Sequence, residues 1–159
     1  MLSVSIRSIA EPGDIEVCAR MMECSEPWIT LGRGYEAGLR ILQDPTRERY
    51  LAAVDRGIAG FVVLVMQGAL VGYLQTLCVA TDKRGSGIGR ALLEHAEAVV
   101  FARHPNLFLT VSDFNEPAQR FYERLGYERI GALRDYLVAG RSEILMRKSR
   151  GPIRGYSPA

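Results

Sequence analysis

The stretch Arg84-Gly85-Ser86-Gly87-Ile88-Gly89-Arg90 decides the fold of this chain. It follows a long apolar segment, residues 70–80, and opens an amphipathic segment, residues 88–101. Three glycines at alternate positions leave the backbone bare at the point where a helix begins. A helix start presents unpaired N–H groups and the positive end of the helix dipole, and both attract anions. The stretch therefore predicts a strand-to-helix turn that binds a diphosphate group.

The size and composition indicate one ordinary globular domain. The chain has 159 residues, of which 48% are apolar and 24% are charged. We predict a single domain over residues 1–150 and a flexible tail over residues 151–159, where two glycines and two prolines lie close together. The net charge of +2 is too balanced to indicate a nucleic-acid partner. No apolar run reaches the ~18 residues of a membrane span, so no membrane partner is expected.

Cysteine usage points to a reducing compartment. The three cysteines, Cys18, Cys24 and Cys78, are an odd number and lack the spacing of a metal site. The first residues show no basic region followed by an apolar core and a cleavage site. We therefore expect reduced thiols, no bound metal and a cytoplasmic location.

Apolar periodicity predicts a mixed α/β fold. Strands are expected over residues 4–9, 50–54, 58–66, 69–80, 107–111, 127–133 and 142–147, and helices over residues 13–22, 36–42, 88–101 and 116–125. The short connections in the first half predict an antiparallel meander. The strand–helix–strand crossover that follows should place residues 70–80 and 107–111 parallel. We thus predict a twisted mixed sheet of about six to seven strands with about four helices.

The glycine turn alone leaves several interpretations open. A Rossmann dinucleotide site needs G-x-G-x-x-G and an acid about twenty residues further on. Here Arg90 follows Gly89, and the later segment reads Asn106-Leu107-Phe108-Leu109. A phosphate loop of the ATPase kind needs Gly-Lys-Ser or Gly-Lys-Thr, which the turn lacks. A glycine-rich turn that only helps a helix to pack is the third alternative.

Two blocks of the sequence resemble the GNAT N-acetyltransferase superfamily. The first is Arg84-x-x-Gly87-x-Gly89, which is similar to the family's acyl-CoA pyrophosphate loop at all three defining positions. The second, residues 115–127, carries an asparagine, a tyrosine and a closing Leu-Gly-aromatic group, as the family's second cofactor block does. The resemblance covers about residues 70–148. Residues before this segment fit the family only in the order of their strands and helices.

The resemblance implies a GNAT-like fold, acetyl-CoA as cofactor, and a primary amine of a small molecule or peptide as acceptor. It implies that the pantetheine arm pairs with the end of the strand before the turn, like an added strand. The N–H of either Cys78 or Val79 would then face the thioester oxygen. The cofactor-binding residues implied in this way are Leu77, Cys78, Val79, Arg84, Gly85, Ser86, Gly87, Ile88, Gly89, Arg90, Asn115, Ala118 and Tyr122.

The same resemblance makes Tyr122 the general acid that protonates the departing sulfur. A tyrosine with the reference pKa of about 10 keeps its proton at neutral pH. On the expected helix Tyr122 flanks the buried stripe and does not continue it. Asn115 has two compatible roles, as a helix cap and as a contact of the pantetheine arm.

The acceptor half of the site is less defined. The strand expected over residues 69–80 carries Tyr73 and Gln75 but no carboxylate. Candidates for the general base are Glu26, Asp113 or a chain of water molecules. The irregular segment 25–35 is expected to build the acceptor pocket, with Glu26, Trp28, Tyr73 and Gln75 as its contacts.

Two other function classes remain open from the sequence. The missing strand carboxylate favours an acyl-CoA-binding regulatory module without turnover. A binder of NAD or ATP is the second alternative. Relatives are commonly dimers, and the apolar final strand is a candidate surface for a homodimer.

Overall fold

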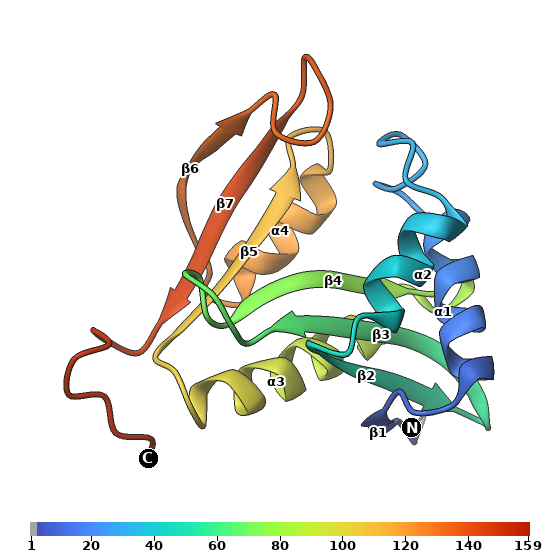
Figure 1. Cartoon of the computed structure of the whole chain (residues 1–159), viewed down its shortest axis with the longest axis horizontal. Coiled ribbons are helices and arrows are strands. Elements are labelled where there is room, and N and C mark those ends of the chain that lie inside the picture. The colour runs from blue at the N-terminus through green and yellow to red at the C-terminus, as the bar shows by residue number, and fades with distance from the viewer. Residues whose placement is uncertain (1–2) are drawn as a thin grey trace.

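The computed structural model describes residues 3–159, which form one seven-stranded sheet with helices on both faces (Figure 1). The strand order is β1-β2-β3-β4-β5-β7-β6. Within the described residues, β4 and β5 pair in parallel and the other neighbouring strands are antiparallel. This confirms the predicted mixed sheet. The strands are β1 (Ser5–Ser8), β2 (Arg47–Val54), β3 (Gly57–Val65), β4 (Tyr73–Val79), β5 (Asn106–Ser112), β6 (Glu128–Arg134) and β7 (Ser142–Ser149).

The helices divide between the two faces of the sheet. They are α1 (Pro12–Glu23), α2 (Tyr35–Gln43), the short 3-10 helix η1 (Thr81–Lys83), α3 (Ile88–Phe101) and α4 (Glu116–Arg124). Along β3, Phe61 and Val63 pack with α1 and α2, whereas Val62 and Leu64 pack with α3. Successive side chains of a strand point to opposite faces, so this continuous apolar run is buried on both sides. In residues 3–159, no helix combines the length and the apolar character that crossing a bilayer requires.

Local sequence signals fixed several boundaries well, but the start of β4 was predicted wrongly. Helix α3 spans the predicted residues, and the Asn115 Oδ1 atom accepts a hydrogen bond from the Ala118 N–H at 3.4 Å, as expected of a cap. The strand predicted from residue 69 instead begins at Tyr73. Gly68 and Gly72 hold φ angles of +91° and +81°, and these left-handed residues turn the chain before β4. The apolar residues between them therefore lie in a turn.

Parallel pairing between β4 and β5 covers two residues only. Tyr73 pairs with Phe108, and Leu74 pairs with Leu109. On the other side of β4, Gln75 has no partner in β3, because the register shifts there. An extra residue of this kind bends a strand and increases its twist. Beyond the bulge β4 and β5 diverge (Figure 1), so one edge of β4 faces a gap.

The final strand of the sheet is an internal one. β7 lies between β5 and β6, with Ser112 opposite Glu143 on one side and Arg134 opposite Ser142 on the other. Its backbone groups are thus used within the chain, and a homodimer cannot form by pairing along β7. The free edge on this side of the sheet is β6.

Gly72 supplies a test of the junction from which β4 and β5 diverge. Its carbonyl accepts the Phe108 N–H at 2.9 Å, and a Cβ there would collide with the Asn106 carbonyl and lie 2.8 Å from Val100 Cγ1. We expect Gly72→Ala to lower the free energy of unfolding by about 3 kcal/mol, from left-handed strain plus overpacking. Urea denaturation measures this change.

The matched control is Gly68→Ala, which has the same left-handed backbone but no heavy atom within 4 Å of the added Cβ. We expect it to cost about 1–2 kcal/mol, the conformational part alone. Equal losses in the two variants would show that the close contact at Gly72 has no effect on stability.

Candidate functional site

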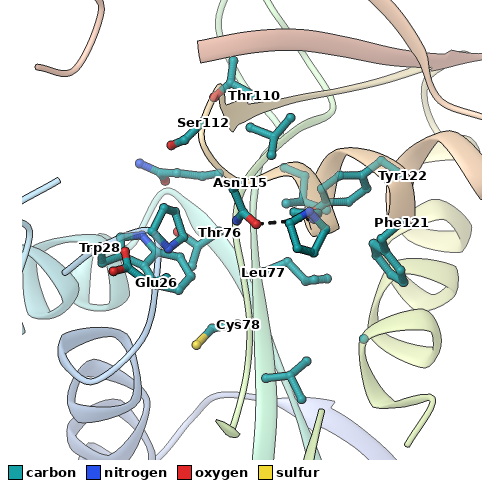
Figure 2. A pocket seen from close by; sticks show the side chains of 18 of the residues that line it. Glu26, Trp28, Thr76, Leu77, Cys78, Thr110, Ser112, Asn115, Phe121 and Tyr122 are labelled. Carbon is teal, nitrogen blue, oxygen red and sulfur yellow. Dashed lines mark hydrogen bonds between the residues drawn. The ribbon is translucent and has the colours of Figure 1, made fainter. Parts of the chain in front are cut away.

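A cavity of about 940 Å³ opens where β4 and β5 diverge (Figure 2). The cavity is lined by loop 25–34, Ile41 of α2, β4, the glycine turn, α4 with its cap, and the neighbouring strands β5 and β7 with the β6–β7 hairpin. All the predicted cofactor and acceptor contacts line this cavity except Ser86 and Ile88. The Ile88 side chain is buried in the core, and the Ser86 hydroxyl donates to the Lys83 carbonyl.

The glycine turn forms a cradle of unused N–H groups. Gly85 and Gly87 have φ angles of +76° and +86°, and Gly87 is the N-cap of α3. A Cβ at either position would meet no heavy atom within 4 Å, so open space lies in front of the backbone. In the described part of the chain, no acceptor is present for the N–H groups of residues 85–90. Such a turn at a helix start fits a diphosphate.

The two arginines that flank the turn are already engaged. Arg90 Nε donates to Glu94 Oε1 at 2.7 Å, four residues along the exposed face of α3. Arg84 Nε donates weakly to the Val79 carbonyl at 3.4 Å. The backbone of the turn therefore offers the more direct anion contacts.

The backbone of β4 shows which N–H groups face the gap. The Ala80 N–H donates to the Ala59 carbonyl at 2.9 Å, toward β3. N–H directions alternate along a strand, so Cys78 also points its N–H toward β3, whereas Leu77 and Val79 point theirs into the gap. Of the two candidates for the thioester oxygen, Val79 has the suitable orientation. Figure 2 shows the Leu77 and Cys78 side chains on opposite sides of β4.

Tyr122 is more deeply buried than its sequence position predicted. The prediction that it flanks the buried stripe of α4 is wrong: Tyr122 and Gln119 are the buried residues, and Phe121 is only partly buried. The Tyr122 ring packs edge-on against Phe121 and Tyr127, with centroids 5.2 and 5.6 Å away. The helix takes this orientation because Gln119 Nε2 donates to the Ser112 and Asp113 carbonyls at 3.0 Å.

The Tyr122 hydroxyl is available to a ligand. Burial raises the pKa of Tyr122 above its ordinary value, which keeps the phenol protonated. In residues 3–159 its oxygen has no hydrogen-bond partner, and yet it is not enclosed, since the residue lines the cavity. A proton donor therefore faces the gap between β4 and β5.

The carboxylates proposed as bases have other partners. The two Glu26 oxygens accept from the Thr30 N–H and hydroxyl at 3.1 and 2.9 Å, so this exposed carboxylate stabilises its own turn. Asp113 is not part of the cavity wall, because its Oδ2 accepts the Ser142 N–H at 2.9 Å beside β7. Geometry thus makes Asp113 a structural residue.

Of the remaining predicted acceptor contacts, Tyr73 and Gln75 are held by hydrogen bonds and Trp28 by apolar packing. Tyr73 and Thr110 share a hydrogen bond of 3.0 Å between their hydroxyls. Gln75 Oε1 accepts from Arg47 Nε at 2.8 Å. Trp28 packs against the apolar cluster of α1 and α2 and borders the cavity.

Sequence reasoning missed Glu143, a buried carboxylate of β7 that lines the cavity. Its Oε1 accepts from the Ser112 hydroxyl at 2.7 Å. Burial is the main cause that raises the pKa of Glu143. A glutamate near the start of an expected strand was visible in the sequence, but nothing in the sequence placed that strand beside β5.

Comparisons with known proteins agree with the family resemblance found in the sequence. A model of the acetyltransferase (GNAT) family matches residues 16–127. An uncharacterized N-acetyltransferase of Methanocaldococcus jannaschii is 34% identical over 108 residues, 67% of this chain and 69% of that protein. The N-alpha-acetyltransferase RimI of Mycobacterium tuberculosis is 33% identical over 136 residues, 73% of this chain and 83% of that protein.

Solved structures share the fold. A GNAT-family structure from Desulfovibrio desulfuricans has a TM-score of 0.78 at 23% identity, covering 92% of this chain and 99% of its own. An aminoglycoside 6'-N-acetyltransferase in complex with coenzyme A has a TM-score of 0.75 at 20% identity, covering 93% and 98%. At these identities the likeness concerns the fold.

The cradle predicts the effect of a methyl group at Gly87. We expect Gly87→Ala to weaken coenzyme A binding about tenfold or more, because the left-handed backbone is strained and the Cβ enters the anion space. Isothermal titration calorimetry measures the affinity. Gly155→Ala is the matched control, with a φ of +81° and open space but no place in the cavity wall. Equal affinity in both variants would contradict the role of the turn.

Proposed function

Since this chain belongs to the GNAT acetyltransferase family and uses acetyl-CoA as its acetyl donor, we propose that it transfers the acetyl group directly to a primary amine of a small molecule or a peptide. One observation carries the proposal: a turn with free N–H groups, the unpaired edge of β4 and an available tyrosine hydroxyl meet in one cavity. Direct transfer requires an aligned thioester and amine, a stabilised carbonyl oxygen and proton movement from nitrogen to sulfur.

Donor binding is assigned to the turn and β4. The N–H groups of residues 85–90 contact the diphosphate, whose charge favours the N-terminus of α3. The pantetheine arm pairs with the free edge of β4 at Leu77 and Val79. The Val79 N–H then donates to the thioester oxygen, where negative charge develops during the attack. Asn115 and Ala118, at the start of α4, border the arm.

Tyr122 is assigned the role of general acid. As the bond between the carbonyl carbon and the sulfur breaks, the phenol gives its proton to the sulfur. The raised pKa keeps Tyr122 protonated from neutral into alkaline pH, so its own ionisation does not lower the rate in that range. Its oxygen is free to donate because it makes no hydrogen bond to residues 3–159.

The acceptor is assigned to the side of the cavity formed by loop 25–34. Glu26, Trp28, Tyr73 and Gln75 line that side and are its proposed contacts. The name of the Mycobacterium tuberculosis relative specifies an alpha-amino acceptor, which supports a primary amine as the substrate class. We also propose a cytoplasmic location, which the free thiols of Cys18, Cys24 and Cys78 support.

The test is release of thiol from acetyl-CoA in the presence of a mixed panel of free amines and short peptides. We expect release that depends on the acceptor and exceeds a reaction without acceptor. Thermal stabilisation by acetyl-CoA without release in any member of the panel would favour a regulatory module instead. Stabilisation by NAD or ATP, with none by coenzyme A, would contradict the donor site as well.

Tyr122→Phe separates catalysis from binding. We expect kcat to fall about 10²-fold, the size typical of a general acid, while the Kd of acetyl-CoA stays close to that of the wild type. Phenylalanine preserves the packing against Phe121 and Tyr127 because only the hydroxyl is lost. An unchanged kcat at saturating substrates would remove Tyr122 from the mechanism.

A further inference from the structure

The cavity wall contains two carboxylates, Glu26 and Glu143, among the residues that the structure describes. They differ in surroundings. Glu26 is exposed, and both of its oxygens accept from Thr30. Glu143 is 4% exposed and uses Oε1 for the Ser112 hydroxyl, while its Oε2 has no hydrogen-bond donor among residues 3–159. Glu143 therefore keeps one carboxylate oxygen without a hydrogen-bond donor from the described chain, in a position that is largely shielded from solvent.

Strand geometry places Glu143 on the acceptor side of the sheet. Leu109 and Val111 belong to the apolar cluster of α3 and α4, so Thr110 and Ser112 point to the opposite face. Glu143 is the cross-strand partner of Ser112 and shares that face. The Tyr73 hydroxyl joins these polar side chains through its hydrogen bond with the Thr110 hydroxyl. Tyr122 enters the cavity from α4, on the other face.

The cavity thus contains two side chains that can donate or accept a proton, one on each side of the gap between β4 and β5. On the α4 side is a protonated phenol. On the loop side is a carboxylate in a row of hydroxyls formed by Tyr73, Thr110 and Ser112. The carboxylate and Val79 line the same cavity, so an amine that enters from the loop side has access to both.

We propose that Glu143 binds the acceptor as an ammonium ion and takes the proton that frees its nitrogen for attack. This inference rests on the proposed function and adds the base that the sequence left undefined. It also defines the acceptor class, since a buried carboxylate selects amines that are cationic in solution. Glu143 is then a catalytic residue carried by β7.

The proton balance of the step is complete. The acceptor ammonium loses one proton to Glu143, which passes it to water. The neutral nitrogen forms the new bond to the carbonyl carbon as the bond from that carbon to sulfur breaks. The nitrogen also loses a second proton, which goes to solvent. Tyr122 gives its own proton to the sulfur and takes one back from solvent. The products are the amide, free coenzyme A and one proton.

The groups around Glu143 are consistent with such a base. Burial and the Asp113 charge raise its pKa, whereas the Ser112 hydrogen bond and the Arg33 charge lower it. The net direction is upward, which brings the carboxyl closer in basicity to an amine. Tyr73 faces the same carboxylate, and burial raises the pKa of Tyr73.

The experiment compares two kinds of acceptor in Glu143→Gln. The first is an aliphatic amine, cationic at pH 7, and the second is an aromatic amine or hydrazide that is already neutral. We expect kcat/KM to fall about 10²-fold for the cationic acceptor and far less for the neutral one. Because free amine increases with pH, the loss for the cationic acceptor should also shrink at alkaline pH. The Kd of acetyl-CoA should not change.

Controls separate this role from a structural one. Glu128→Gln removes a carboxylate of the same hairpin, which pairs with Arg147 outside the cavity wall, and should keep wild-type rates. Equal losses for both acceptors in Glu143→Gln, or no loss, would overturn the proposal. If that variant fails to fold, Glu143→Asp keeps a carboxylate and should retain the wild-type preference for the cationic acceptor. A lost preference there would also overturn it.

These results are distinguishable from failure of the proposed function. If the wild type acetylates no amine, the proposed function fails together with the role of Glu143. If the wild type acetylates amines and Glu143→Gln does so equally well, the transferase assignment stands and the base lies elsewhere.

Discussion

The divergence of β4 from β5 is the constraint on which the rest of the molecule depends. Two residues of parallel pairing, anchored at Gly72, hold the strands together, and the bulge at Gln75 sends them apart. If β4 and β5 had stayed fully paired, β4 would have no free edge beside the glycine turn to bind an extended ligand. The gap gives β4 unsatisfied N–H groups in a site where a substrate can pair with them.

The two sides of the opening are built by different physical means. The proposed donor side is mostly backbone: a left-handed glycine turn and a strand edge, both of which depend little on the identity of neighbouring side chains. The proposed acceptor side is mostly side chain, with hydroxyls, a tryptophan and a buried carboxylate contributed by separate segments. Backbone sites can keep one ligand through large changes of sequence, whereas side-chain sites change their ligand with few substitutions. This difference explains why membership of a family identifies the donor and leaves the acceptor to be measured.

The same division explains what the sequence could predict. The turn at Gly85 and Gly87 and the Asn115 cap are set by residues within a few positions of one another, so local patterns located them. The burial of Tyr122 depends on the hydrogen bonds of Gln119 to β5, and the importance of Glu143 depends on β7 lying next to β5. Both are contacts between distant segments, which periodicity does not report. The start of β4 was predicted wrongly for a related reason. The residues before Tyr73 are apolar, and hydrophobicity alone does not distinguish a strand from a turn.

The order of β5, β7 and β6 has a consequence for how the enzyme comes into being. β6 is made before β7, but it has no place in the sheet until β7 has inserted beside β5. During synthesis the glycine turn and Tyr122 leave the ribosome well before Glu143 does. A nascent chain can thus have the residues of its proposed donor site while the Glu143 part of the cavity wall is still missing. Glu143 is translated after the glycine turn and Tyr122, so a chain cut short before β7 lacks both Glu143 and the docking strand for β6.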